Sequence, residues 1–282
     1  MASSSLGRQA EPGDFSAFAA RKKPGMALDY VAATPRLARV TPASQLENGS
    51  APEMAASGIA EIDALTGGLP RGCVSEVCGY ASSGRTSLLL AALASATQRQ
   101  EVCALVDATD AFDPLSAAAA GVDFPRLLWV RCGTQKKNPA PGHRLSQKNP
   151  ELHALEQALR VTDLLLQSGG FGLVMMDLCD IPFAAARRIP LATWFRFQRV
   201  IERTPTVLLL LTETPIAATC ASFLLRLRGG KLLPVSPSLS EPAHAQLLEE
   251  LPMEAELMRA RMERKPVRSV GTVFSTKAVR IS

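Results

Sequence analysis

The sequence predicts an α/β fold in which a mainly parallel sheet is covered by helices on both faces. Short, continuously apolar runs alternate with longer segments of helical periodicity, and this alternation is typical of parallel sheets. In addition, one strand, one glycine-rich loop and one helix follow each other directly over residues 73–98. The expected strands are 73–79, 102–108, 127–132, 173–178 and 206–213.

Composition and periodicity divide the chain into three regions. Residues 1–50 are rich in Ala, Ser, Pro, Arg and Lys, which indicates a flexible N-terminal arm with one short helix near 27–40. Residues 51–240 hold the alternating core. Residues 241–282 are expected to form a helical and extended C-terminal tail that binds a partner, with a helix over 244–265 interrupted by Pro252 and strand character over 269–282.

The helices of the core have individual signals. Ile59, Ile62 and Leu65 mark a short amphipathic helix that ends at a Gly-Gly pair. The Ala- and Leu-rich segment 86–98 and the segment 151–169 have clear helical periodicity. The remaining expected elements are a short helix in the segment 114–125 that ends at Gly121, an exposed loop over 133–150, a helix over 191–203 and a hairpin over 223–235.

Composition also restricts the class of protein. Hydrophobic residues make up 47% and charged residues 20%, which is ordinary for a soluble globular protein. The formal net charge of +5 permits an acidic partner such as DNA but does not require one. None of the six cysteines forms a CxxC pair, which argues against a zinc site. No apolar run reaches the roughly 18 residues of a membrane span, and the N-terminus lacks a secretory signal, so we expect a cytoplasmic protein.

The stretch 79-GYASSGRTS-87 has the pattern of a phosphate-binding loop. Its two glycines let successive backbone N–H groups turn toward a phosphate, and the helix that follows adds its positive N-terminal end. Arg85 stands where lysine is usual; it is still a cation, but its bulk and flat shape would move the nucleotide. The candidate nucleotide-binding residues are Gly79, Ser82, Ser83, Gly84, Arg85, Thr86, Ser87 and Asp177.

A magnesium site is expected beside this loop. Thr86 would place its hydroxyl on Mg²⁺, and Asp177, at the end of an apolar strand, would hold the ion through water. The alternative for Asp177 is a residue that only marks the place where a strand meets solvent. The pattern admits ATP with Mg²⁺ and leaves open whether the nucleotide binds. No residue is assigned a catalytic role.

From Gly58 to about Asp123 the chain resembles the ATPase core of RecA and related recombinases. The segment 58–72 is similar to that family's approach to the glycine loop, and 76-EVCGYASSGRTS-87 is similar to the loop itself. The segments 106–114 and 121–123 resemble the part after its second strand. The resemblance covers roughly half of the chain and is weaker after residue 124. It implies a RecA-like fold that binds ATP and Mg²⁺.

The chain departs from that family at four places to which the resemblance assigns a function. The glutamate that activates water corresponds to Thr109, which cannot act as a general base near neutral pH, and the adjacent Asp110 points elsewhere. The aromatic residue that stacks on adenine falls near Ser116. The glutamine that senses the γ-phosphate corresponds to Glu213, whose charge would repel phosphate. The long DNA-binding loop corresponds to the short segment 214–223. We therefore expect the scaffold without the recombinase activity.

Among RecA relatives the chain most resembles the ImuA subfamily, whose members are accessories of SOS-induced mutagenesis, through its degenerate site and the segments 190–217 and 222–228. This resemblance implies a role in DNA repair by translesion synthesis, with a Y-family-like polymerase subunit and an error-prone replicative-type polymerase as partners and weak or absent ATPase activity. RecA and DNA are further candidate partners. Two alternatives stay open: an active DNA-dependent ATPase that forms filaments on single-stranded DNA, and an inhibitor that caps RecA filaments.

Two kinds of surface have a functional and an ordinary interpretation. Trp194, Phe195, Arg196 and Arg199 combine aromatic and cationic side chains on one expected helix. That mixture is typical of a surface that binds a partner or DNA, and equally of an amphipathic helix with aromatic core residues. Further cations lie in the loop and the tail: Lys136, Lys137, Arg144, Lys148, Arg259, Arg261, Arg264, Lys265 and Arg268.

Overall fold

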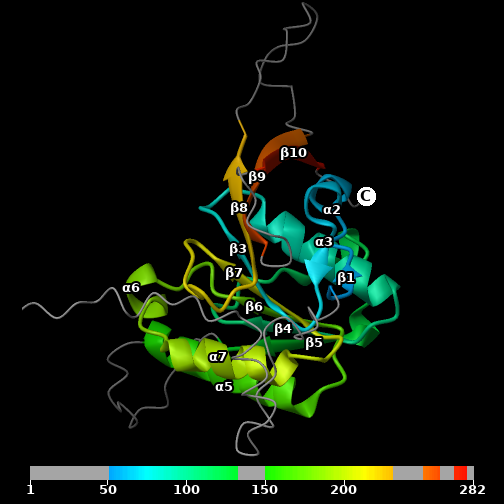
Figure 1. Cartoon of the computed structure of the whole chain (residues 1–282). Coiled ribbons are helices and arrows are strands. Elements are labelled where there is room, and N and C mark those ends of the chain that lie inside the picture. Colours follow the sequence, from blue (N-terminus) through cyan, green and yellow to red (C-terminus); the bar gives the residue numbers. More distant parts are fainter. Residues whose placement is uncertain (1–50, 133–149, 231–249, 261–269, 278–282) are drawn as a thin grey trace, which may run out of the picture. The chain divides into compact units, whose positions relative to one another are not determined.

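The computed structural model describes residues 51–132, 150–230, 250–260 and 270–277 (Figure 1). The predicted N-terminal arm, the loop over 133–149 and the tail cations between 261 and 268 lie outside the described residues and stay predictions. Within the described ranges, no helix is both long enough and apolar enough to cross a membrane.

The centre of the fold is one eight-stranded sheet. Its strands are β3 (Val74–Cys78), β4 (Cys103–Asp107), β5 (Leu127–Arg131), β6 (Leu173–Asp177), β7 (Val207–Thr212), β8 (Phe223–Gly229), β9 (Glu250–Ala260) and β10 (Val270–Lys277). They lie in the order β10-β9-β8-β3-β7-β6-β4-β5, and those from β8 to β5 are all parallel. The five predicted strands and the mainly parallel α/β fold are therefore confirmed. A separate short pair joins β1 (Met54–Ala55) to β2 (Leu69–Pro70).

Helices cover both faces of the sheet. They are α2 (Ala60–Thr66), α3 (Arg85–Gln98), α4 (Pro114–Ala119), α5 (Pro150–Ser168), α6 (Phe183–Ala186) and α7 (Leu191–Ile201). Figure 1 shows α2 and α3 on one face and α5 and α7 on the other. Leu88 of α3 packs in a cluster with Val77 of β3, whereas Trp194 of α7 packs in a second cluster with Val74. Burial on both faces explains why the parallel strands are continuously apolar.

The C-terminal region differs from its predicted form. Residues 250–260, predicted as part of a helix, form strand β9, which pairs antiparallel with β8. Met253 and Ala255 are buried while Glu254 between them is exposed, which is the period of two that a strand with one buried face requires. Pairing with the edge of β8 outweighs the local helix preference of Glu, Leu and Met. The extended character predicted after residue 269 is confirmed by β10.

Residues 231–235 of the hairpin predicted over 223–235 lie outside the described residues, so the hairpin stays a prediction. Residues 223–229 form strand β8, which lies between β3 and β9. In the described part of the chain, the antiparallel partner of β8 is β9, which begins only at Glu250. A distant partner of this kind leaves no local turn signal in the sequence.

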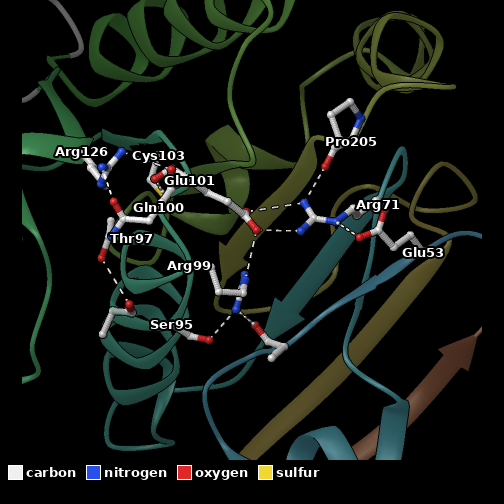
Figure 2. Close-up of polar contacts among 12 residues, drawn as sticks. Glu53, Arg71, Ser95, Thr97, Arg99, Gln100, Glu101, Cys103, Arg126 and Pro205 are labelled. Atoms are coloured by element: carbon white, nitrogen blue, oxygen red, sulfur yellow. Dashed lines mark hydrogen bonds and ion pairs between the residues drawn. The ribbon is translucent and has the colours of Figure 1, made fainter.

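A polar cluster joins the amino ends of three strands (Figure 2). Arg71 Nη2 donates to Glu101 Oε1 at 2.7 Å and Arg71 Nη1 donates to the Pro205 carbonyl oxygen at 2.8 Å, which connects the segments before β3, β4 and β7. Burial alone would raise the pKa of Glu101, but hydrogen bonds from Arg71 and Arg99 bring it below its ordinary value. Arg71 Nε also forms an ion pair with Glu53 at 3.3 Å. We therefore interpret the cluster as a support of the frame at the edge opposite to the glycine loop.

Candidate nucleotide site

The glycine-rich loop 79–84 connects β3, near the centre of the sheet, to α3 at the carboxyl ends of the parallel strands. Open α/β sheets bind ligands at this edge. A Cβ on Gly79 would lie 2.5 Å from the Leu227 carbonyl oxygen and from Ser83 Oγ, so the loop can run this close to β8 only with glycine. Gly84 has a φ of 89° and caps α3 in the left-handed region that favours glycine. The predicted strand–loop–helix unit is confirmed.

Two buried polar atoms lie in and directly after this loop. Ser83 Oγ and Arg85 Nη1 are buried, and neither has a hydrogen-bond partner among the described residues. Buried polar groups normally have a partner, so these atoms indicate that a polar ligand or water completes the site. The first N–H groups of α3 also lack partners within the helix and add its positive end. A hydroxyl, a guanidinium and a helix N-terminus together fit a phosphate group.

A pocket of about 140 Å³ lies beside the start of α3. It is lined by Arg85, Thr86 and Asp177, so the structure brings three of the predicted site residues together. Ser82 is exposed, and its φ of 60° turns the backbone of the loop. Ser87 instead lines a larger groove of about 930 Å³ that runs along α3.

Ser116 lies where the two hollows meet. It lines the small pocket together with Arg85 and the larger groove together with Ser87 and Phe274. Its hydroxyl donates to Asp113 Oδ2 at 2.6 Å, and Asp113 in turn caps the start of α4. Leu90 of α3 also lines both hollows, so the two lie on neighbouring parts of this helix.

Asp177 ends β6 and is largely buried inside the small pocket. The pKa of Asp177 lies above its ordinary value, chiefly because of burial and also because of the nearby negative charge of Asp107. Hydrogen bonds from Cys179 and the positive charge of Arg85 oppose this rise only in part. One carboxylate oxygen accepts a hydrogen bond from the backbone N–H of Cys179 at 3.0 Å. Arg85 is therefore the cation that favours the charged form of Asp177 while the pocket is otherwise poorly solvated.

The two residues predicted to hold Mg²⁺ line the same pocket, since both Thr86 and Asp177 face it. Hydroxyl and carboxylate oxygens are ligands that suit this ion, which otherwise keeps several waters. Among the described residues there is no group of three or more His, Cys, Asp or Glu that could hold a metal by itself. A magnesium ion here would depend on oxygens from a bound phosphate and water.

Comparison with known proteins identifies the part of the chain that carries this site. Residues 45–138 match the family described as the RecA N-terminal domain. This segment is RecA-like. Over 111 residues, 39% of its length, the chain is 38% identical to protein RecA of Ectopseudomonas oleovorans and of Rhizobium leguminosarum bv. trifolii (strain WSM2304), and 40% identical to that of Acidiphilium cryptum (strain JF-5). The matched part spans 26%, 25% and 26% of those relatives, about a quarter of their length.

In the RecA-like core, Asp107 at the end of β4 is fully used for hydrogen bonding. Its Oδ1 accepts from the backbone N–H groups of Thr109 and Ala111, and its Oδ2 accepts from the N–H of Phe112 and from Trp129 Nε1. A carboxylate that accepts four hydrogen bonds holds the turn in place and has no lone pair left over for a proton from water.

The other two carboxylates after β4 are also engaged. Asp110 pairs with Arg131, and the hydrogen bond from that guanidinium lowers the pKa of Asp110. Asp113 accepts hydrogen bonds from the hydroxyl and backbone of Ser116 and from Leu115, which lowers its pKa. Thr109 therefore has no free carboxylate beside it in this turn that could replace a general base.

Glu213 does not lie where its predicted effect would require. It lines a separate small hollow with Leu178, Ile181 and Phe183, on the face that α6 covers. It is not among the residues that line the pocket of Arg85. The expected repulsion between Glu213 and a bound phosphate therefore has no support in the structure, because the side chain at the end of β7 is directed to the other face of the sheet.

Two residues at the site were missed from the sequence. Phe112 lines the small pocket and packs edge-to-face against Trp129 with ring centroids 5.1 Å apart, so an aromatic wall exists beside the loop although Ser116 is not aromatic. Glu76 lies in the middle of β3, buried, and accepts hydrogen bonds from Thr212 and from the N–H of Ile216. An acidic residue inside an apolar strand, in 73-CVSEVCG-79, is the signal that could have identified Glu76.

Proposed function

We propose that this chain is a RecA-like accessory protein in DNA damage-induced mutagenesis, with weak or absent ATPase activity. The observation that carries the proposal is the contrast within one site. The loop retains the geometry that fits a phosphate, while the carboxylates after β4, at Asp107, Asp110 and Asp113, are all committed to hydrogen bonds. A site that can hold nucleotide while the carboxylates after β4 are engaged elsewhere suits a protein that acts through contacts with other proteins.

Nucleotide binding is part of this proposal. The N–H groups of the loop, Arg85 and the start of α3 would hold the phosphates of ATP, and Thr86 and Asp177 would hold Mg²⁺. ATP bound with Mg²⁺ would supply a high negative charge at this edge of the sheet. The residues of the chain would orient it, and Asp177 would face Arg85 and the ion in the same pocket.

The proposed partners are a Y-family-like polymerase subunit and an error-prone replicative-type polymerase in translesion synthesis, with RecA and DNA as further candidates. A second candidate function is an active DNA-dependent ATPase that forms filaments on single-stranded DNA. The match of residues 45–138 to the RecA N-terminal domain favours that alternative. The engaged carboxylates after β4 weigh against it. The two candidates predict different rates of ATP hydrolysis in the presence of single-stranded DNA.

We expect wild-type protein to bind ATP with Mg²⁺ in isothermal titration calorimetry, and Arg85→Ala to bind it at least about tenfold more weakly. The reason is the loss of one charge-assisted hydrogen bond, which contributes roughly 1.5–3 kcal/mol. Arg160→Ala, at an exposed position on α5, is the matched control and should bind like wild type. Absence of binding in all three proteins would show that the loop holds no nucleotide and would contradict this part of the proposal.

The accessory role predicts two further results together. The rate of ATP hydrolysis should be low and unchanged when single-stranded DNA is added, with a RecA protein as the positive control in the same assay. On co-expression, the chain should co-purify with a Y-family-like polymerase subunit. Hydrolysis stimulated by single-stranded DNA would favour the filament-forming alternative, and failure to co-purify would count against the accessory role.

A further inference from the structure

The outer face of α7 exposes a strip of apolar side chains. Leu191 and Phe195 are 49% and 53% exposed, although Trp194 and Phe197 on the opposite face are completely buried. Residues four apart lie above one another on a helix, so Leu191 and Phe195 form one continuous strip. Both interpretations of this helix are therefore correct for different residues. Trp194 and Phe197 belong to the core, whereas Phe195 is exposed.

Arginines surround this strip. Arg187 and Arg188 are exposed just before α7, Arg199 is exposed one turn beyond Phe195, and Arg203 follows the end of the helix. Arg196 is different, because its Nε pairs with Asp163 of α5 at 3.0 Å. The exposed Glu202 is the acidic residue nearest to Arg203 in sequence and offsets only part of this charge. The apolar residues Leu191 and Phe195, together with Arg187, Arg188 and Arg199, are called the α7 strip below. Helix α7 itself packs along α5 (Figure 1).

No undescribed segment of the chain carries enough negative charge to match the arginines of the α7 strip. Residues 133–149 carry Lys136, Lys137, Arg144 and Lys148 and no acidic residue. Residues 1–50 and 261–269 also hold more Lys and Arg than Asp and Glu, and residues 231–249 carry only Glu241 and Glu249 against Lys231. A second copy binding through the same face would place arginines against arginines, which is unfavourable. The complementary occupant is therefore acidic and comes from another molecule.

We propose that the α7 strip is the docking surface for an acidic amphipathic helix of a partner protein. This inference rests on the proposed function, in which the chain acts through protein contacts. The apolar side chains of such a helix would cover Leu191 and Phe195, and carboxylates along its edges would pair with Arg187, Arg188 and Arg199. A protein helix fits better than a nucleic acid strand, because Leu191 offers no surface for base stacking and the apolar residues follow helical spacing.

A display experiment tests the chemistry of the occupant. The probe is a library of peptides about four helical turns long, with leucines fixed at spacings of three and four and edge positions randomised among Glu, Gln and Lys. The library is selected on the full-length protein and depleted on full-length Phe195→Asp. We expect Glu to be enriched over Lys at the edge positions. A selected peptide should bind wild type at least about tenfold more tightly than Phe195→Asp, as is usual for a central apolar contact.

Two control variants show whether binding depends on the α7 strip itself. Leu115→Asp changes a leucine on α4 that is 72% exposed, more than Phe195, and should bind the selected peptide like wild type. Thermal unfolding should confirm that Leu115→Asp and Phe195→Asp remain folded. Arg199→Glu should weaken peptide binding through the change of charge alone. The inference is overturned if Glu is not enriched at the edge positions, or if the selected peptide binds Phe195→Asp as tightly as wild type. It is also overturned if Phe195→Asp weakens the binding of a fluorescent oligo(dT) but not the binding of any peptide.

The result is also distinguishable from a failure of the proposed function. If no peptide is selected but a Y-family-like polymerase subunit still co-purifies with the chain, this inference fails while the accessory role stands. If the peptide binds through Phe195 but no polymerase subunit co-purifies, the docking surface stands and the accessory role fails. Wild type and Phe195→Asp should be compared in both assays.

Discussion

Deletion of residues 241–282 is expected to unfold the central sheet and its helices and not to remove a dispensable tail. The deletion takes away β9 and β10, which form one end of the central sheet. Met253, Ala255 and Phe274 from these strands are buried in the same cluster as Leu88 of α3 and Val77 of β3. The loss of several such side chains would exceed the roughly 5–15 kcal/mol by which domains are stable. Far-UV circular dichroism and urea unfolding measure the outcome.

A single substitution in β10 tests the contribution of these strands to stability without removing them. Phe274→Ala is expected to lower the free energy of unfolding by about 3–5 kcal/mol, because a buried aromatic side chain leaves a cavity. Val273→Ala, at the neighbouring position that is 59% exposed, is the matched control and should change it by no more than about 0.5 kcal/mol. Equal unfolding midpoints for both variants, or a deletion that stays folded, would show that β9 and β10 are not part of the stable core.

The position of these strands also bears on the nucleotide site. A Cβ on Gly84 would lie 3.1 Å from Met253 Cγ and 3.3 Å from Phe274 Cζ, so the C-terminal strands pack against the end of the glycine-rich loop. Partner binding by the C-terminal region stays a proposal, but a deletion cannot test it because it removes the support of the loop. Substitutions at exposed positions such as Val273 are the appropriate test.

Replacement of Glu76 by alanine is the second change with a large expected effect, about 2–4 kcal/mol in the free energy of unfolding. Glu76 Oε1 accepts from the N–H of Ile216 at 2.7 Å and from Thr212 Oγ1 at 3.2 Å, and its carboxylate also accepts from the N–H of Ala217. Alanine would leave these donors without a partner. Ser75→Ala is the neighbouring control, because the buried Ser75 hydroxyl has no partner among the described residues and its loss should cost little.

The pH dependence of stability gives an independent check on Glu76. Burial raises its pKa, and the hydrogen bonds from Ile216, Ala217 and Thr212 only partly oppose this. Protonation is therefore easier in the folded than in the unfolded chain, so this contribution to stability is complete below the ordinary pKa of Glu, about 4.3, and is lost as the pH rises through the raised value. Wild type should lose stability relative to Glu76→Gln as the pH rises from about 4 to 8 in urea unfolding. A constant difference across this range would contradict the assignment.

The role of Glu76 connects the sheet to the segment after β7. In RecA-like recombinases, by the resemblance described above, this segment is the DNA-binding loop; here it is short, and Glu76 fixes its backbone from the centre of the sheet. A loop whose N–H groups are held by a buried carboxylate has little freedom to reorganise around DNA. This observation agrees with a protein that has kept the scaffold and acts through its outer surfaces.

Local sequence patterns were sufficient for the parallel half of the protein. The apolar runs identified five strands, and the glycines at 79 and 84 identified the loop, because the period of burial and the need for a left-handed residue are properties of a few neighbouring residues. Asp177 was placed in the site for the same reason, since its strand ends at the edge where the loop begins. The fold class and three residues of the candidate pocket could therefore be predicted without the structure.

The tertiary structure alone decided the features that depend on distant partners. Residues 250–260 have helix-forming side chains, yet they form β9 because the open edge of β8 supplies hydrogen bonds and a buried face. Glu213 is directed away from the loop, and Asp107 is consumed by the turn that follows it, because each orientation depends on which elements pack nearby. Local propensity is weak compared with these long-range contacts. The sequence by itself therefore determined the parallel strands and the glycine-rich loop, and the packed structure decided which polar groups remain free to bind a ligand.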